Sequence, residues 1–126
     1  MIDVLLVDDH PVMRQFLREM LESYADLTIV GEAQNGEDAV AQATTLQPSV
    51  VIIDINLPTM SGIQATKLIK LQSPFTAVIG LTAGVQGHNE STMIAAGAAA
   101  VINKGEVFEA LYPSILEAVR RLRSTV

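Results

Sequence analysis

Short apolar runs alternate with longer amphipathic segments along the whole chain. Runs of consecutive aliphatic residues, bounded by polar or turn residues, are typical of strands buried on both faces of a sheet. Such runs predict strands at residues 3–7, 27–30, 50–54, 77–81 and 100–102. The run at 50–54 is the most regular, because four β-branched residues precede a single carboxylate, Asp54.

Between these runs, apolar side chains recur at intervals of three and four residues, which predicts helices. The first helix is expected to begin at Pro11, since proline fits the first turn of a helix. Asn35-Gly36 opens a second helix, which ends before Pro48. Further helices are predicted at 61–71 and, after a flexible loop at 84–87, at 89–96. The apolar stripe of the first helix comprises Met13, Phe16, Leu17, Met20 and Leu21.

The last segment combines an apolar stripe with an internal proline, Pro113. Proline kinks a helix when it lies inside one, whereas it is well tolerated in the first turn. The segment is therefore either one kinked helix or a short turn over 106–112 followed by a helix that begins at Pro113. Because the stripe keeps its phase on both sides of the proline, we expect the continuous helix. The stripe comprises Phe108, Leu111, Ile115, Val119 and Leu122.

Alternation of strands and helices predicts an α/β fold for residues 1–126 as one domain. Strands that alternate with helices form a five-stranded parallel sheet with helices on both faces, joined by right-handed crossovers. Many unrelated functions use such a scaffold, so the fold alone does not indicate the chemistry.

Composition excludes several classes of protein. No apolar run reaches the roughly 20 residues of a membrane span and the N-terminus lacks a signal-peptide pattern, so we expect a cytoplasmic protein without membrane contact. The absence of cysteine excludes disulfides, thiolate nucleophiles and Cys-ligated zinc. A net charge of −6 argues against nucleic-acid binding by this domain. The exception, Arg120, Arg121 and Arg123, is explained by the preference of helix C-termini for cations.

Polar side chains follow four of the predicted strands, at the point where each strand ends. Asp8 and Asp9 follow the first strand, Asp54 ends the third, Thr82 follows the fourth and Lys104 lies just after the fifth. Each residue alone is explained by a cap, a turn or a solvated charge. Because parallel strands end at one edge of a sheet, where ligands bind in such folds, the set together predicts a functional site.

Three neighbouring carboxylates repel one another unless a cation lies between them. Hard oxygen ligands favour Mg²⁺, which commonly bridges protein carboxylates and phosphate oxygens. Thr82 offers a hydrogen-bond donor and Lys104 a positive charge to further phosphoryl oxygens. The arrangement suits phosphoryl transfer, in which positioning and charge neutralisation dominate.

The chain resembles the receiver domain of bacterial two-component response regulators, a family with the five-stranded, doubly wound fold called CheY-like or flavodoxin-like. Asp-Asp-His-Pro near the start is most similar to the NarL/FixJ branch, whose receivers usually precede a DNA-binding helix-turn-helix. The resemblance runs through nearly the whole chain. It rests on Leu5-Leu6-Val7-Asp8-Asp9-His10, Ile52-Ile53-Asp54-Ile55-Asn56-Leu57-Pro58, Met60-Ser61-Gly62, Leu81-Thr82-Ala83 and Ala95-Ala96-Gly97-Ala98 leading to Lys104.

The resemblance implies a role for each site residue. Asp54 would accept a phosphoryl group from a sensor histidine kinase, a histidine phosphotransfer protein or a small phosphodonor. Asp9, Asp54 and the backbone carbonyl of Asn56 would bind Mg²⁺, with Asp8 acting through water, while Thr82 and Lys104 would contact the phosphoryl group. The resemblance also implies an output through an effector domain outside this chain, which would bind the DNA, and leaves a homodimer open.

Two positions depart from the family pattern. Val101 stands where an aromatic switch residue is usual, three residues before Lys104, and no proline follows Lys104 closely. A pure interaction module that is never phosphorylated therefore remains an alternative. A phosphatase of the haloacid-dehalogenase type is a second one, but Asn56 replaces the second aspartate of its motif. No glycine-rich turn follows the first strand, which argues against a dinucleotide-binding domain.

Overall fold

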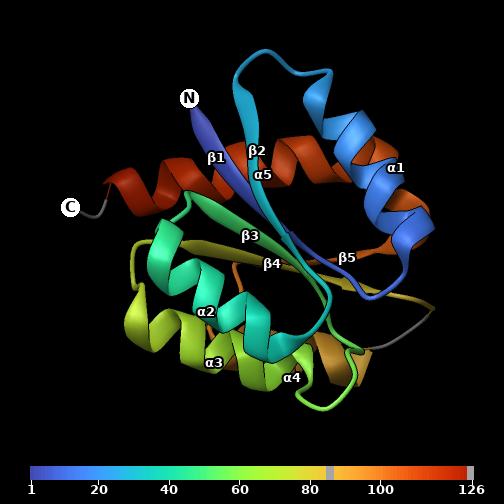
Figure 1. Cartoon of the computed structure of the whole chain (residues 1–126), viewed down its shortest axis with the longest axis vertical. Helices are drawn as coiled ribbons and strands as arrows, with labels where there is room; N and C mark the ends of the chain where they lie inside the picture. The colour runs from blue at the N-terminus through green and yellow to red at the C-terminus, as the bar shows by residue number, and fades with distance from the viewer. Residues whose placement is uncertain (85–86, 125–126) are drawn as a thin grey trace.

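The computed structural model describes residues 1–84 and 87–124, which form alternating strands and helices (Figure 1). The strands are β1 (Ile2–Val7), β2 (Leu27–Ala33), β3 (Val50–Asp54), β4 (Ala77–Thr82) and β5 (Ala100–Asn103). The helices are α1 (Pro11–Glu22), α2 (Gly36–Leu46), α3 (Gly62–Gln72), α4 (Gly87–Ala96) and α5 (Val107–Ser124), with a 3₁₀ turn, η1, at Lys104–Glu106.

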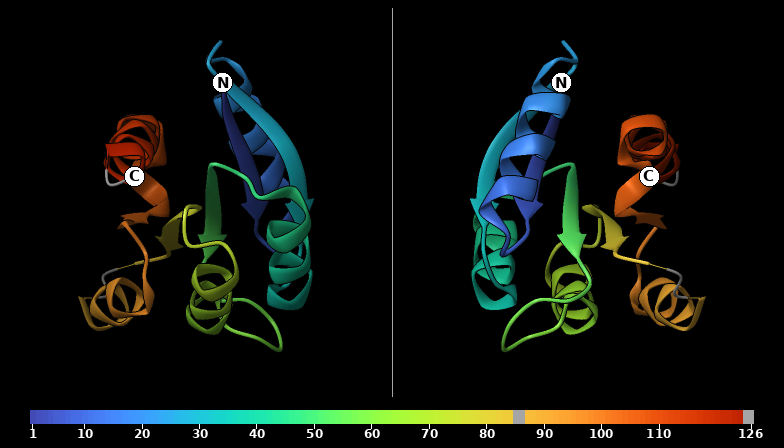
Figure 2. Two further views of the ribbon diagram at one scale, coloured as in Figure 1. Left: turned by 90° about the vertical axis from the view of Figure 1, so that its left-hand side faces the viewer. Right: turned by 90° about the vertical axis from the view of Figure 1, so that its right-hand side faces the viewer.

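All five strands are parallel and pair in the order β2-β1-β3-β4-β5. Helices α1 and α5 cover one face of the sheet, and α2, α3 and α4 cover the other (Figures 1 and 2). The predicted doubly wound fold is therefore confirmed. No helix within residues 1–84 and 87–124 is long and apolar enough to cross a membrane.

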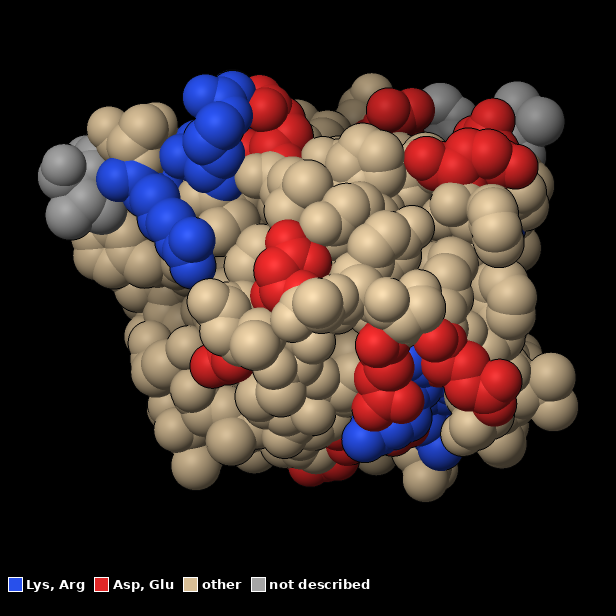
Figure 3. All heavy atoms as spheres, turned by 90° about the horizontal axis from the view of Figure 1, so that it is seen from above, with Lys and Arg blue, Asp and Glu red and all other residues tan. Residues whose placement is uncertain are grey.

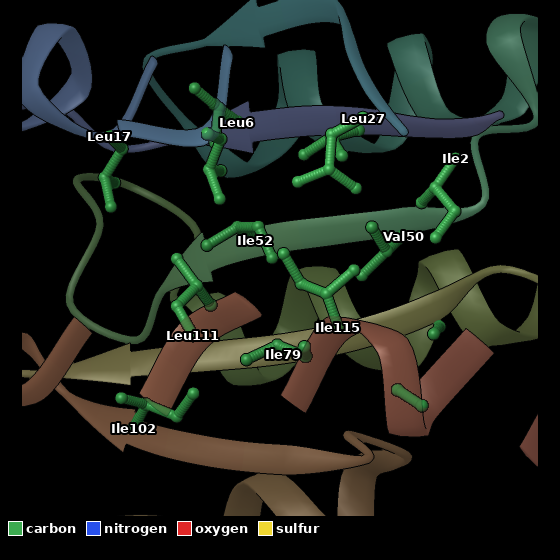
Figure 4. Close-up of a cluster of buried hydrophobic side chains, with 14 of the residues drawn as sticks. Ile2, Leu6, Leu17, Leu27, Val50, Ile52, Ile79, Ile102, Leu111 and Ile115 are labelled. Atoms are coloured by element: carbon green, nitrogen blue, oxygen red, sulfur yellow. The ribbon is translucent and has the colours of Figure 1, made fainter. Parts of the chain in front are cut away.

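Each face of the sheet has its own core, because successive side chains of a strand point to opposite faces. Val50 and Ile52 of β3 pack against α1 and α5, where they meet Leu111 and Ile115 (Figure 4). Val51 and Ile53 of the same strand belong to the second core, beneath α2, α3 and α4. Since β3 is buried along its whole length, its last residue, Asp54, is fixed at the sheet edge by packing on both sides.

The last segment is one helix that runs through Pro113, so the predicted continuous helix is confirmed and the alternative turn over 106–112 is wrong. The residues of the stripe share one face of α5, but Phe108 is 71% exposed, and the neighbouring Val107 is buried instead. Phe16 on α1 is similarly 45% exposed. Phe16 lies at the margin of its stripe, whereas Phe108 lies in the first turn of α5; helical spacing alone does not show which part of a stripe other elements cover.

The helix after the loop predicted at 84–87 begins earlier than the predicted residue 89. Residues 85 and 86 lie outside the described part of the chain, and α4 already begins at Gly87. Gly84, at the end of the described loop, has a φ of 100°, in the left-handed region that favours glycine.

Candidate functional site

The register of the sheet brings the predicted site residues to one edge. Asp8 directly follows β1, Asp54 ends β3, Thr82 ends β4, and Lys104 directly follows β5. Because the strands are parallel, these positions share the carboxyl-terminal edge. The aligned pairs at this edge are Val7 with Ile53, Asp54 with Leu81, and Thr82 with Asn103.

The ammonium of Lys104 bridges two buried carboxylates. Its Nζ lies 2.9 Å from Asp54 Oδ2 and 3.0 Å from Asp8 Oδ2, although the side chains of Asp8 and Asp54 are 0% and 3% exposed. Burial lowers the pKa of Lys104, but hydrogen bonds to Asp54 and Asp8 and their charges outweigh that effect, so the pKa is raised overall. Lys104 is therefore a firmly protonated counter-ion at neutral pH.

Four side chains offer a set of metal-ligand atoms beside this ion pair. One atom each from Asp8, Asp9, His10 and Asp54 lies within 4.8 Å of the others. Within the described ranges, Asp9 Oδ1 is buried without a hydrogen-bond partner, and a buried oxygen in that state needs a ligand or water. Carboxylate oxygens in this number and spacing fit Mg²⁺, so the predicted ligand residues do come together.

The backbone around Asp54 fixes the direction of its carboxylate. Asn56 donates its backbone N–H to Asp54 Oδ1 at 2.9 Å, and Gly62 donates its own to the carbonyl of Ile55 at 2.8 Å. The start of α3 thereby lies directly against the end of β3. A side chain at position 62 would collide with this backbone, since a Cβ there would lie 2.8 Å from Ile55 Cα. The role of the Asn56 carbonyl stays a prediction.

Thr82, on the strand next to that of Asp54, lies at the same edge of the sheet. Thr82 is 6% exposed, and its hydroxyl has no hydrogen-bond partner among residues 1–84 and 87–124. Asn103 donates from Nδ2 to the carbonyl of Gly84 at 2.8 Å, which ties the end of β5 to the loop after β4. A buried, unpaired hydroxyl is available for a ligand that brings an acceptor.

Sequence reasoning missed three contributors to the site: His10, Asn103 and Arg14. Arg14 donates to the Asp8 backbone carbonyl at 2.7 Å and pairs with Glu32 at 2.8 Å. Figure 3 shows basic side chains in two groups on one face, one near the C-terminal end and one among acidic side chains. His10 could have been predicted from the sequence, since a histidine next to paired aspartates is a possible metal ligand. Arg14 and Asn103 carried no such signal, because their partners are distant in sequence.

A comparison with known protein families identifies the family of this chain. The family described as "Response regulator receiver domain" matches residues 4–116. The chain belongs to the response regulator receiver domain family. This membership places the receiver domain in two-component systems and confirms the resemblance stated from the sequence; it also sets aside the phosphatase and dinucleotide-binding folds as families for this chain.

Relatives with several outputs share this receiver domain. The response regulator UvrY of Escherichia coli K12 is 36% identical over 124 residues, which are 98% of this chain and 55% of that protein. A protein-glutamate methylesterase/protein-glutamine glutaminase of Methanosarcina acetivorans is 44% identical over 87 residues, 69% of this chain and 25% of that protein. The receiver domain thus spans about half or less of the length of these relatives.

Solved structures agree with the fold. The response regulator domain of Thermotoga maritima CheB superposes with a TM-score of 0.88 at 32% identity, covering 94% of this chain and 96% of that one. The signal receiver domain of the response regulator NarL from Mycobacterium tuberculosis has a TM-score of 0.89 at 24% identity, with coverage of 94% and 96%. The UvrY sequence, 36% identical over 98% of this chain, supports the NarL/FixJ-like branch, and the NarL structure agrees with the fold.

The departure at the switch position has a plain structural counterpart. Val101 of β5 is half-buried and packs against the core beneath α2, α3 and α4. Valine has no ring to rotate between an inward and an outward position, so this receiver domain lacks an aromatic switch at that place. In the described part of the chain, the polar partners of the Asp54 carboxylate are Asn56, Lys104 and His10, and Val101 is not among them.

Proposed function

We propose that this receiver domain, residues 1–126 as one domain, accepts a phosphoryl group on Asp54 and changes conformation in response. The observation that carries the proposal is the convergence of Asp54 with a protonated ammonium and an unpaired hydroxyl at one sheet edge. Lys104 lies 2.9 Å from Asp54 Oδ2, and the Thr82 hydroxyl is buried without a partner in the described part of the chain. A phosphoryl group on Asp54 would supply the acceptor that the Thr82 hydroxyl lacks and a further anionic partner for the Lys104 ammonium.

The proposed donor is the phosphohistidine of a sensor histidine kinase or of a histidine phosphotransfer protein. An Asp54 carboxylate oxygen attacks phosphorus, the phosphorus–nitrogen bond breaks, and the imidazole nitrogen leaves with the electron pair. The product is an aspartyl phosphate, which water later hydrolyses. Asn56 holds the carboxylate through its N–H, so the attacking oxygen is oriented before the donor arrives, and positioning of this kind is the main source of rate in phosphoryl transfer.

Asp8, Asp9, Asp54 and the Asn56 carbonyl are the proposed holders of Mg²⁺. The fit rests on the donor set, which is rich in carboxylate oxygen, and on the orphaned oxygen of Asp9. When bound, Mg²⁺ neutralises charge on the phosphoryl oxygens and on the carboxylates. Asp8 is wholly buried and paired with Lys104, which supports an indirect role for it, through water.

Phosphorylation is proposed to act as a switch through the loop after β4. The new group adds about −1.5 to −2 charges, which draws the Thr82 hydroxyl and the Lys104 ammonium toward it. Asn103 links the β5 end to the Gly84 carbonyl, so a movement at either strand end reaches both. The phosphoryl group biases the two conformers only by its different contacts in each.

The proposed output is transcription, through a helix-turn-helix domain outside this chain. Support comes from the extent of the similarity, because UvrY aligns with 98% of the chain and the transcriptional regulatory protein YdfI of Bacillus subtilis with 93%. The methylesterase of Methanosarcina acetivorans aligns with 69% only. A cytoplasmic location, DNA binding by that separate domain alone, and a homodimer belong to the same proposal.

Mass spectrometry after incubation with acetyl phosphate and Mg²⁺ tests the proposal. The native chain is expected to gain the mass of one phosphoryl group and to lose it on standing, whereas Asp54→Asn is expected to gain nothing. Glu90→Gln, on an exposed position of α4, is the matched control and is expected to be labelled like the native chain.

Two results would contradict the proposal. An unlabelled native chain that still binds Mg²⁺ would favour the pure interaction module, and labelling that persists in Asp54→Asn would place the acceptor elsewhere. Steady turnover of a small phosphoester such as p-nitrophenyl phosphate, measured on the same preparation, would instead indicate a phosphatase.

A further inference from the structure

His10 lies beside the carboxylates but has no task in the proposed phosphoryl chemistry. Its Nδ1 lies 3.0 Å from Asp8 Oδ1, 3.3 Å from Asp9 Oδ1 and 4.0 Å from Asp54 Oδ2. The imidazole is 64% exposed, so core packing does not hold it there. One nitrogen thus faces oxygens of all three aspartates.

Two atoms that share one cation through metal–ligand bonds of about 2.1 Å lie at most about 4.2 Å apart. Nδ1 lies within this distance of the Asp9 and Asp54 oxygens, so one cation could contact the nitrogen together with both carboxylates. We propose that His10 is a nitrogen ligand at this site, which makes the receiver domain take first-row transition metals such as Ni²⁺ in competition with Mg²⁺.

The surroundings support a ligand site rather than a chance group of acids. Asp8 is fully buried, Asp9 Oδ1 is a buried atom without a hydrogen-bond partner, and the buried Thr82 hydroxyl at the same edge also lacks one within the described ranges. Buried polar atoms are normally satisfied, so these oxygens are arranged for something that is not part of the chain.

A nitrogen ligand from His10 changes which cations the site binds more tightly. Mg²⁺ prefers oxygen and keeps several waters, whereas imidazole suits Ni²⁺, Cu²⁺ and Zn²⁺, whose affinities already rise along the first-row series. An imidazole in the ligand set therefore adds affinity for the transition metals and little for Mg²⁺. The inference rests on the proposed function in one respect, since it takes Asp9 and Asp54 as the direct carboxylate ligands and Asp8 as acting through water.

The competing explanation is that His10 only donates a hydrogen bond from Nδ1 to Asp8 Oδ1, 3.0 Å away. In that case the nitrogen carries a proton and offers no lone pair to a metal. The two explanations differ in one measurable quantity, the ratio of Ni²⁺ affinity to Mg²⁺ affinity, because a hydrogen-bond donor does not discriminate between the two cations.

Isothermal titration calorimetry with Mg²⁺ and with Ni²⁺ tests the inference on the native chain, His10→Gln, His10→Ala and His88→Gln. Both His10 variants are expected to lower the Ni²⁺/Mg²⁺ affinity ratio at least about tenfold, since loss of an imidazole ligand weakens Ni²⁺ binding and affects Mg²⁺, which prefers oxygen, much less. His10→Ala excludes rescue by an amide oxygen. His88→Gln removes the second of the two histidines and is expected to keep the native ratio.

An unchanged ratio in both His10 variants would overturn the inference, and so would a loss of the ratio in His88→Gln. Far-ultraviolet circular dichroism checks that each variant is folded. The experiment distinguishes this inference from the proposed function. If Asp54 is labelled by acetyl phosphate but the Ni²⁺/Mg²⁺ affinity ratio does not change in the His10 variants, only the nitrogen ligand is refuted. If the ratio depends on His10 but Asp54 is not labelled, only the phosphoacceptor role is refuted.

Discussion

Replacing Lys104 with methionine is expected to destabilise the receiver domain when no divalent cation is present. Methionine keeps the unbranched, largely apolar stem, so the change removes the ammonium and little packing. Asp8 and Asp54, whose side chains are 0% and 3% exposed, then face each other without their counter-ion. Breaking a buried ion pair from one side costs about 3–5 kcal/mol; because the Lys104 side chain is 18% exposed, we expect the lower end, about 3 kcal/mol.

The pH dependence of this difference follows from the raised pKa of Lys104. A lysine whose pKa is higher in the folded state than in the unfolded chain stabilises the fold fully below the ordinary lysine pKa, about 10.4. That stabilisation disappears as the pH rises through the folded-state pKa. The free-energy difference between native chain and Lys104→Met is therefore expected to be constant from neutral pH to about pH 9 and to shrink in stronger alkali.

Urea unfolding followed by circular dichroism, with a chelator and then with excess Mg²⁺, measures both effects. Lys67→Met, at an exposed position of α3, is the control and is expected to stay within about 0.5 kcal/mol of the native chain. Mg²⁺ is expected to reduce the difference in unfolding free energy between the native chain and Lys104→Met, because it neutralises the same carboxylates. A Lys104→Met chain as stable as the native one in chelator would refute the account of the site as a charge cluster held by Lys104.

Three further outcomes are expected. Gly62→Ala should lower stability and slow acetyl phosphate labelling, because a Cβ at position 62 would lie 2.8 Å from Ile55 Cα beside the acceptor; normal labelling and an unchanged urea midpoint would contradict this. Leu111→Ala, at a site with 0% exposure, should cost about 2–5 kcal/mol of unfolding free energy, whereas Phe108→Ala, 71% exposed, should cost well under half as much in the same assay. The hydrogen bond from Tyr112 to Asp26, followed by burial and the Asp26 charge, raises the pKa of Tyr112, so Asp26→Ala should shift tyrosinate formation, read by ultraviolet absorbance, to lower pH; an unshifted curve would assign the raised pKa to another cause.

The strands and the site edge were predictable because their signals are local. A run of aliphatic residues ending in one carboxylate, as at 50–54, encodes both a buried strand and its polar end. Parallel strands end at the same edge of a sheet, so the predicted topology alone placed Asp8, Asp54, Thr82 and Lys104 at one edge. The same reasoning kept α5 continuous across Pro113, because the stripe keeps its phase.

The remaining features depend on tertiary contacts that a local pattern does not contain. Arg14 pairs with Glu32, 18 positions away, and Asn103 donates to the carbonyl of Gly84, 19 positions away. The end of α2 is another case: Gln47, with a φ of 47°, takes the left-handed conformation usually given to glycine or asparagine. Phe108 shares the helical phase of the buried stripe but lies in the first turn of α5, where the packing of neighbouring elements decides which side chain is covered.

The Lys104 ammonium, directly after the edge strand β5, pairs with residues at the ends of β1 and β3, on the other side of β4. Its partners lie 96 and 50 positions earlier in the chain. During synthesis Asp8 and Asp54 leave the ribosome before Lys104, so their carboxylates lack this counter-ion until β5 joins the sheet. The proposed phosphorylation of Asp54, which uses Lys104, would then require the finished domain.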